Sequence, residues 1–159
     1  MSTLHEHTVV LTLGNEMLGD DGAGVLFGRK VAAQADIPVV EGGSAPENML
    51  GVVAQKSPVV ILIADAMDFG GEPGEYRVIP SGRIGGNSLS THGSTELCVR
   101  FLEALTEAEV IVLGFQPEQL TFGDGVSPKV ARTVERAAGQ FVSQGIEGLS
   151  PASDGEVES

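Results

Sequence analysis

Basic residues are scarce in this chain. Its 159 residues contain 9 Lys and Arg against 22 Asp and Glu, which gives a formal net charge of -13 at pH 7. A nucleic-acid surface needs a basic face that displaces the counterions of the phosphates, and an acidic chain is repelled by anionic lipid. We therefore expect neither nucleic acid nor a membrane among the partners of this protein.

Long apolar runs and paired cysteines are also missing. No apolar run approaches the roughly 20 residues that span a bilayer, and the first residues, MSTLHEHT, lack the charged and apolar regions of a signal peptide. A single cysteine, Cys98, cannot form an internal disulfide, which fits a reducing compartment. The sequence thus predicts a cytoplasmic protein.

Cys98 lies in the helix-like segment TELCVRFLEAL. Four apolar residues share one predicted helical face there: Leu97, Cys98, Phe101 and Leu102. Because free cysteine packs as a small apolar side chain, we interpret Cys98 as a core residue and not as a nucleophile. The serine elbow Gly-x-Ser-x-Gly is absent as well, so neither a cysteine nor a serine nucleophile is expected.

The glycine-rich motifs that cradle phosphate are missing too. The stretch LTLGNEMLGDDGAG, residues 11–24, joins an apolar run to a helix-like one, but it contains neither Gly-x-Gly-x-x-Gly nor Gly-x-x-x-x-Gly-Lys-Ser/Thr. Its adjacent carboxylates, Asp20 and Asp21, would repel a phosphate at the helix entrance. One of them could instead stabilise the helix N-terminus by about 0.3–1 kcal/mol, but a second adds repulsion. The turn is predicted to bind a cation.

Strand-like and helix-like segments alternate along the chain. Apolar and β-branched runs predict strands over 8–14, 37–43, 57–67 and 108–117, and a shorter edge strand over 74–80. Helical spacing predicts helices over 22–36, 44–56, 94–105 and 127–145. This alternation is typical of a single-domain, three-layer α/β/α sandwich with a mainly parallel twisted sheet of about five strands.

Local signals set the expected boundaries. Ser44 and Glu47 form a capping-box pattern for the second helix, and Gly145 is expected to end the last one. The remaining sequence is rich in Gly, Ser, Pro and acid, so we expect one domain over 1–146 and a disordered acidic tail over 147–159.

Polar residues follow the predicted parallel strands, whose carboxyl ends meet at one edge of the sheet. Asp20 and Asp21 follow the first strand, Glu41 closes the second, Asp65 ends the third and Gln116 ends the strand from 108. A carboxylate that ends an apolar run must be paired or open into a cleft, so Asp65 is the strongest candidate for function.

A histidine joins this set of acids. His92 lies in the glycine- and serine-rich segment GRIGGNSLSTHGSTEL, whereas His5 and His7 belong to a terminus that we expect to be unanchored. A histidine together with two aspartates forms a ligand set that suits a borderline transition metal such as nickel or zinc.

Several segments in order and register now carry a resemblance. They are LGNEMLGDDGAG, VEGGSAPEN, ILIADAMD, GEYRVI, STHGSTEL and LGFQPE, which together extend over roughly residues 8–145. The chain resembles the hydrogenase maturation endopeptidases, which remove a C-terminal extension from the large subunit of nickel-iron hydrogenases. It is most similar to the type that processes the hydrogenase of the formate hydrogenlyase complex.

The resemblance implies roles for individual residues. The metal-binding and catalytic set of the family falls on Asp21, Asp65 and His92 of this chain, and Asp20 would then cap the helix. Glu41 stands where relatives commonly carry Asp, which keeps the carboxylate on a longer arm. The resemblance further implies that the metal is nickel already held by the precursor's cysteines, with zinc or cadmium as surrogates, and the protein is expected to act as a monomer on that nickel-loaded precursor.

The implied mechanism uses nickel as a recognition element, because a scissile bond fixed beside the site gains an entropic advantage. Water would be activated either by the metal or by an Asp carboxylate acting as general base. Two other functions remain open on the residues alone. One is a flavodoxin-like module that binds an anion or nucleotide at GGSAPEN, and the other is a nickel carrier without peptidase activity.

Overall fold

The structure is a computed structural model that describes residues 5, 7–84, 89–90 and 94–149. Its sheet has the strand order β2-β1-β3-β6-β4. Four strands are parallel, namely β1 (Thr8–Leu13), β2 (Val39–Gly43), β3 (Val60–Asp68) and β6 (Glu109–Phe115). The edge strand β4 (Tyr76–Pro80) runs antiparallel to β6, and the short β5 (Leu89–Ser90) pairs with the end of β3. The mainly parallel sheet is confirmed.

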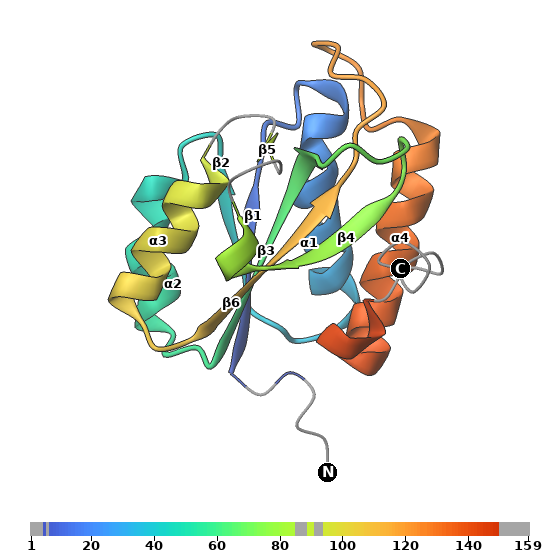
Figure 1. Cartoon of the computed structure of the whole chain (residues 1–159). Coiled ribbons are helices and arrows are strands. Elements are labelled where there is room, and N and C mark those ends of the chain that lie inside the picture. The colour runs from blue at the N-terminus through green and yellow to red at the C-terminus, as the bar shows by residue number, and fades with distance from the viewer. Residues whose placement is uncertain (1–4, 6, 85–88, 91–93, 150–159) are drawn as a thin grey trace.

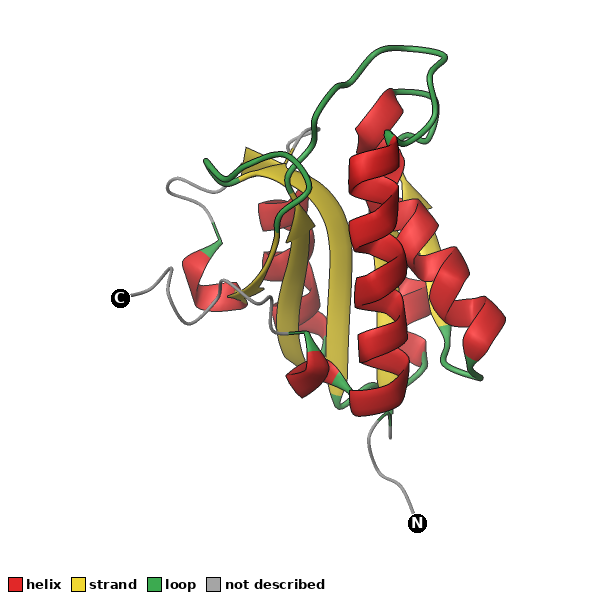
Figure 2. Ribbon diagram, turned by 90° about the vertical axis from the view of Figure 1, so that its right-hand side faces the viewer, coloured by secondary structure: helices red, strands yellow, loops and turns green. Residues whose placement is uncertain are grey.

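Helices cover both faces of this sheet (Figures 1 and 2). On one face lie α1 (Ala23–Gln34) and α4 (Pro128–Gln144), and on the other lie α2 (Leu50–Gln55) and α3 (Thr95–Leu105). Each face has its own apolar core. Phe27, Phe115 and Phe141 belong to the core beneath α1 and α4, and Leu11 and Leu102 belong to the core on the opposite face. The predicted three-layer sandwich is confirmed.

The alternation of side chains along β3 decides where its carboxylate lies. Ile61, Ile63 and Met67 pack into the core beneath α2 and α3, whereas Leu62 and Ala64 pack beneath α1 and α4. Because successive side chains of a strand point to opposite faces, Asp65 belongs with the odd-numbered set. The sequence of β3 therefore directs Asp65 towards α3.

The predicted inward face of α3 is wrong in part. Cys98 and Leu102 are buried as expected, but Leu97 and Phe101 are about half exposed. The buried face of the helix is instead completed by Thr95 and Val99. Apolar residues occupy a wider arc of this helix than the sheet can cover, so their spacing alone does not identify the buried side.

The capping box predicted for the second helix is also wrong. The chain enters this helix through a 3-10 turn, η2 (Pro46–Met49), with Ala45 at the N-cap and no capping bond from a side chain. Proline fixes the backbone at the first position of this turn, so the helical segment begins two residues beyond Ser44. The predicted partner Glu47 lies inside the turn.

Both ends of the described chain are attached to α4. Gly145 ends that helix with a φ of 75°, as predicted, and is followed by the 3-10 turn η4 (Ile146–Gly148) and by Leu149, which is buried in the core. The proposed domain boundary at 146 thus falls within a packed segment. His5 Nε2 donates to the carbonyl oxygen of Val142 at 2.9 Å, so His5 is anchored and the expectation of a loose terminus is wrong for it. Among the described residues, no helix has the length and apolarity needed to cross a bilayer.

Candidate active site

The turn between β1 and α1 carries the first candidate carboxylate. Asp21 lies in the 3-10 turn η1 (Gly19–Gly22) and is buried, and its Oδ2 accepts a hydrogen bond of 2.7 Å from the backbone N–H of Asn15. The turn closes tightly over the end of β1. Gly14 has a φ of 125°, and a Cβ there would lie 2.2 Å from the carbonyl oxygen of Asp21, so only glycine fits. The local sequence thus fixes the Asp21 carboxylate at the carboxyl end of β1.

A second close approach places this turn beside β3. Gly24, near the start of α1, packs on the strand ends so tightly that a Cβ there would lie 2.3 Å from the carbonyl oxygen of Ala64. Ala64 immediately precedes Asp65, and β1 and β3 are hydrogen-bonded neighbours. The two aspartates predicted to act together therefore lie at the same edge of the sheet, Asp21 in the turn that follows β1 and Asp65 on the adjacent strand β3.

Asp65 is held from the opposite side by α3. Its carboxylate is completely buried, and Oδ2 accepts a 2.5 Å hydrogen bond from the hydroxyl of Thr95, the first residue of that helix. Thr95 is itself buried. A short hydrogen bond donated to a carboxylate is among the stronger polar contacts in a protein, so Thr95 fixes the orientation of Asp65. Sequence reasoning missed Thr95, although STHGSTEL places its hydroxyl at the predicted helix start.

The buried cysteine lies within the field of the same carboxylate. Burial, together with the negative charges of Asp65 and Glu47, raises the pKa of the Cys98 thiol to about 12. A thiol with this pKa stays protonated near neutral pH, and only the thiolate is a competent nucleophile. Cys98 is therefore a core residue, as the sequence predicted.

Asp20 has a different task from the one expected. Its buried carboxylate accepts four hydrogen bonds from the segment 118–127: from the backbone N–H of Glu118, Gln119 and Ser127, and from the Ser127 hydroxyl, at 2.6 to 3.1 Å. No side-chain hydrogen bond caps η1 or α1. The expected capping role is wrong, and Asp20 instead ties the first turn of the molecule to the loop that leads into α4.

Gln116 organises a second loop at this edge. Its buried side chain accepts hydrogen bonds from the backbone N–H of Phe69 and Gly71 through Oε1, at 3.0 and 3.1 Å, and donates to Asp68 through Nε2. The hydrogen bonds from Gln116 and from the backbone of Gly70 lower the pKa of Asp68. Gln116 is thus placed at the carboxyl edge, as predicted, where it shapes the loop that follows β3.

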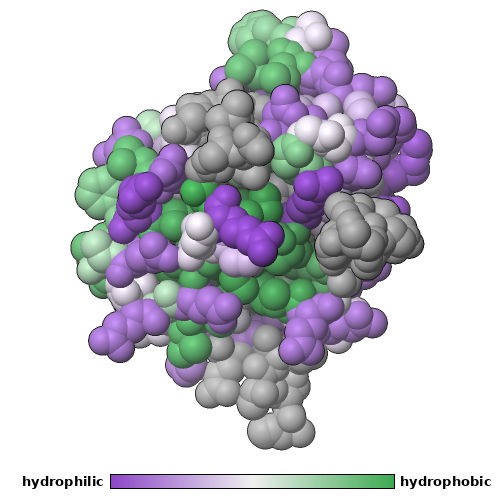
Figure 3. Space-filling model, viewed as in Figure 1, coloured by the Kyte–Doolittle hydropathy of each residue, from purple (hydrophilic) through white to green (hydrophobic). Residues whose placement is uncertain are grey.

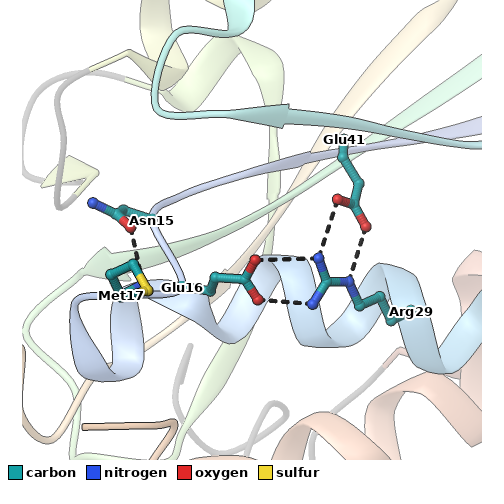
Figure 4. A network of polar contacts seen from close by, with 5 residues as sticks. All are labelled: Asn15, Glu16, Met17, Arg29 and Glu41. Atoms are coloured by element: carbon teal, nitrogen blue, oxygen red, sulfur yellow. Dashed lines mark hydrogen bonds and ion pairs between the residues drawn. The ribbon is translucent and has the colours of Figure 1, made fainter. Parts of the chain in front are cut away.

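Glu41 lies in an ion-pair network on the surface (Figure 4). The guanidinium of Arg29 on α1 contacts Glu16 at 2.7 Å and Glu41 at 3.0 Å, and all three side chains are about half exposed. Exposed ion pairs contribute little to stability. The network borders a cleft of about 240 Å³, which is lined by both glutamates and by Gly14 and Asn15. The carboxylate of Glu41 is thus engaged by Arg29 at the wall of this cleft.

Comparison with known proteins identifies the family. The profile of HycI, hydrogenase maturation protease, matches residues 26–144. This chain belongs to the HycI family of hydrogenase maturation proteases. It is 38% identical over 131 residues to the hydrogenase 3 maturation protease of Escherichia coli K12, a match that covers 80% of this chain and 83% of that relative.

Solved structures agree with this membership of the HycI family. The solution structure of the endopeptidase HycI from Escherichia coli is similar with a TM-score of 0.72 and 33% identity, covering 86% of this chain and 89% of that one. The crystal structure of a NiFe hydrogenase maturation protease HycI from Thermococcus kodakarensis KOD1 gives a TM-score of 0.76 at 28% identity, covering 89% and 91%. The chain is thus an endopeptidase of the HycI family, and membership implies processing of the C-terminus of a hydrogenase large subunit.

The third residue predicted for this HycI-family site, His92, lies outside the described residues, as does the rest of 91–93. The described residues on either side contact the end of β3: Ser90 pairs with Met67, and Thr95 donates to Asp65. Within 5, 7–84, 89–90 and 94–149, no group of three or more His, Cys, Asp and Glu side chains is placed to hold a metal ion. The described part of the site therefore consists of two buried carboxylates, Asp21 and Asp65.

Proposed function

We propose that this protein removes the C-terminal extension of a nickel-iron hydrogenase large-subunit precursor after nickel insertion, and that nickel in the precursor is its recognition element. The observation that carries the proposal is the placement of two buried carboxylates at one edge of the sheet: Asp21 in the turn that follows β1, and Asp65 on the adjacent strand β3. Asn15, which donates to Asp21, lines the cleft. A buried carboxylate is costly unless it is hydrogen-bonded or paired, and buried acids in neighbouring positions are concentrated at functional sites.

The donor set suits the metal. Carboxylate oxygens together with an imidazole nitrogen are ligands that nickel and zinc accept, and His92 would supply the nitrogen. Support for including His92 comes from its neighbours in the chain, because Ser90 and Thr95 are both fixed beside the end of β3. Zinc or cadmium would serve as a surrogate in binding experiments. We propose Asp21, Asp65 and His92 as the residues that bind the precursor's nickel.

The same carboxylates fit the hydrolytic step. An Asp carboxylate within reach of the attacking water accepts its proton and returns a proton to the amine that leaves, which balances the cleavage of the peptide bond. Thr95 and the Asn15 N–H hold the two carboxylates in fixed orientations before the substrate arrives. The protonated thiol of Cys98 takes no part.

The anion-binding alternative is disfavoured by the cleft itself. The carboxylates of Glu16 and Glu41 line it, next to Gly43 and Ser44 of the segment that would cradle a phosphate. A phosphate there would meet negative charge. The nickel carrier is the second candidate, because the same three ligands would serve delivery, and only cleavage of the precursor distinguishes it from a protease.

Incubation with matched precursors tests the proposal. Purified protein is mixed with nickel-loaded and with metal-free large-subunit precursor, and the mass of the large subunit is followed over time. We expect the nickel-loaded precursor to be shortened at its C-terminus and the metal-free form to keep its mass. Equal cleavage of both forms would refute the recognition role of nickel, and nickel uptake without any shortening would favour the carrier.

A further inference from the structure

Three exposed apolar side chains gather beside the candidate active site. Met17, Leu120 and Phe122 are 52%, 45% and 71% exposed, and we call them the apolar rim. Figure 3 shows an apolar projection at the top of the molecule, where Figure 1 places the loop between β6 and α4. Large apolar side chains that project together into water, rimmed by polar residues, mark an interaction surface more often than chance exposure does.

The rim is built as one unit with the turn that carries the aspartates. Leu18 and Phe122 form an isolated antiparallel bridge, and the N–H of Gly123 donates to the carbonyl oxygen of Met17 at 2.8 Å. Asp20 adds its four hydrogen bonds to the same loop, between Glu118 and Ser127. The buried carboxylate of Asp20 thus holds the loop that carries the exposed apolar side chains in place. Such a preorganised surface loses little conformational entropy when a partner binds.

The rim is continuous with the site. Met17 lines the cleft of about 240 Å³ together with Gly14 and Asn15, and the N–H of Asn15 donates to Asp21. A peptide segment that extended from the cleft past Met17 would reach the loop that carries Leu120 and Phe122, because Gly123 is hydrogen-bonded to Met17 and Phe122 is bridged to Leu18. Under the proposed function, the chain expected along this path is the large-subunit precursor, because its peptide bond is cut at Asp21 and Asp65.

We infer that the apolar rim docks an apolar segment of the large-subunit precursor next to the scissile bond. This inference rests on the proposed function. It also explains why two aspartates are adjacent: Asp21 belongs to the proposed cleavage site, and Asp20 holds the loop that would bind the substrate. The rim is a docking surface and takes no part in the bond-breaking step.

The test compares rim variants with a matched control. Phe122→Ser and Leu120→Ser each remove one exposed rim side chain, and Phe101→Ser removes an exposed phenylalanine from α3, outside the rim. The kcat and KM for nickel-loaded precursor are measured by the rate of large-subunit shortening. We expect both rim variants to raise KM about tenfold with kcat within about twofold of the wild type, and the control to match the wild type in both. All three should melt within a few degrees of the wild type, since the substituted side chains are exposed.

The outcomes separate this inference from the function on which it rests. If the wild type does not shorten the precursor at all, the proposed function fails. If the wild type cleaves and both rim variants keep its KM, the rim is not the docking surface, although the protease assignment stands. Sedimentation shows whether the rim joins two copies of this chain: a wild-type dimer that the rim variants convert to monomers with unchanged KM would also overturn the inference. Should Phe122→Ser melt far below the wild type, Leu120→Ser decides.

Discussion

Replacing Asp20 by Asn distinguishes the role of Asp20 from that of its neighbour Asp21. Both oxygens of the Asp20 carboxylate are acceptors: Oδ1 for the N–H of Ser127, and Oδ2 for the N–H groups of Glu118 and Gln119 and for the Ser127 hydroxyl. An amide offers one acceptor and one donor, so in either orientation its NH₂ group faces a backbone N–H. Asparagine at position 20 therefore leaves at least one of these backbone N–H groups without its acceptor.

The magnitude follows from the less costly orientation. The amide NH₂ then faces the N–H of Ser127, a buried residue, and an unsatisfied buried donor costs about 1–3 kcal/mol. The remaining three bonds lose the assistance of the negative charge, which roughly halves their strength. We expect a loss of about 3 kcal/mol in the free energy of unfolding. For a chain of this size that loss lowers the melting temperature by about 6–12 °C.

Thermal unfolding of Asp20→Asn, with Asp21→Asn as the matched control, measures this difference. At position 21 the amide oxygen can still accept the hydrogen bond from the N–H of Asn15, so we expect Asp21→Asn to melt near the wild type and to lose cleavage. Asp20→Asn should instead melt lower and retain residual cleavage with a raised KM, because the apolar rim is loosened. Equal melting temperatures for Asp20→Asn and the wild type would refute the bracing role.

Three further predictions test other parts of the structure. Thr95→Val, which keeps the shape but not the donor to Asp65, should lower the kcat of precursor cleavage about tenfold or more, and Thr95→Ser should restore most of it. His92→Ala should abolish cleavage and leave the melting temperature within a few degrees, which cleavage and melting assays check side by side. Leu149→Ala should cost about 2 kcal/mol or more in the free energy of unfolding, because it leaves a cavity, whereas Leu105→Ala on the exposed side of α3 should cost about 0.5 kcal/mol or less in the same denaturation experiment.

The sheet and the position of Asp65 were predictable because they depend on local patterns. The apolar run that forms β3 ends in a carboxylate, and strand alternation directs that carboxylate to one face. Parallel strands then bring Asp21 to the same edge without any knowledge of side-chain contacts. Features that follow from the alternation of side chains along a strand, or from the shared edge of parallel strands, are therefore predictable from the sequence.

The different roles of Asp20 and Asp21 were not predictable in this way. The partners of Asp20 lie 98 to 107 residues along the chain, in a loop without periodicity, so no local pattern links them. The docking of Leu149 escapes prediction for a related reason: one apolar side chain in a polar segment packs because α4 places it there. Composition describes the average of such a segment and not the packing of an individual residue.

We propose that Asp65 serves the cleavage of a nickel-loaded hydrogenase large-subunit precursor. Mass spectrometry of that precursor after incubation with wild type or with Asp65→Asn tests it most directly, because the amide keeps the shape and can still accept the hydrogen bond from Thr95. We predict that the wild type yields the shortened large subunit, and that the folded Asp65→Asn variant leaves the precursor mass unchanged. Wild-type rates of shortening by Asp65→Asn would contradict this role of Asp65.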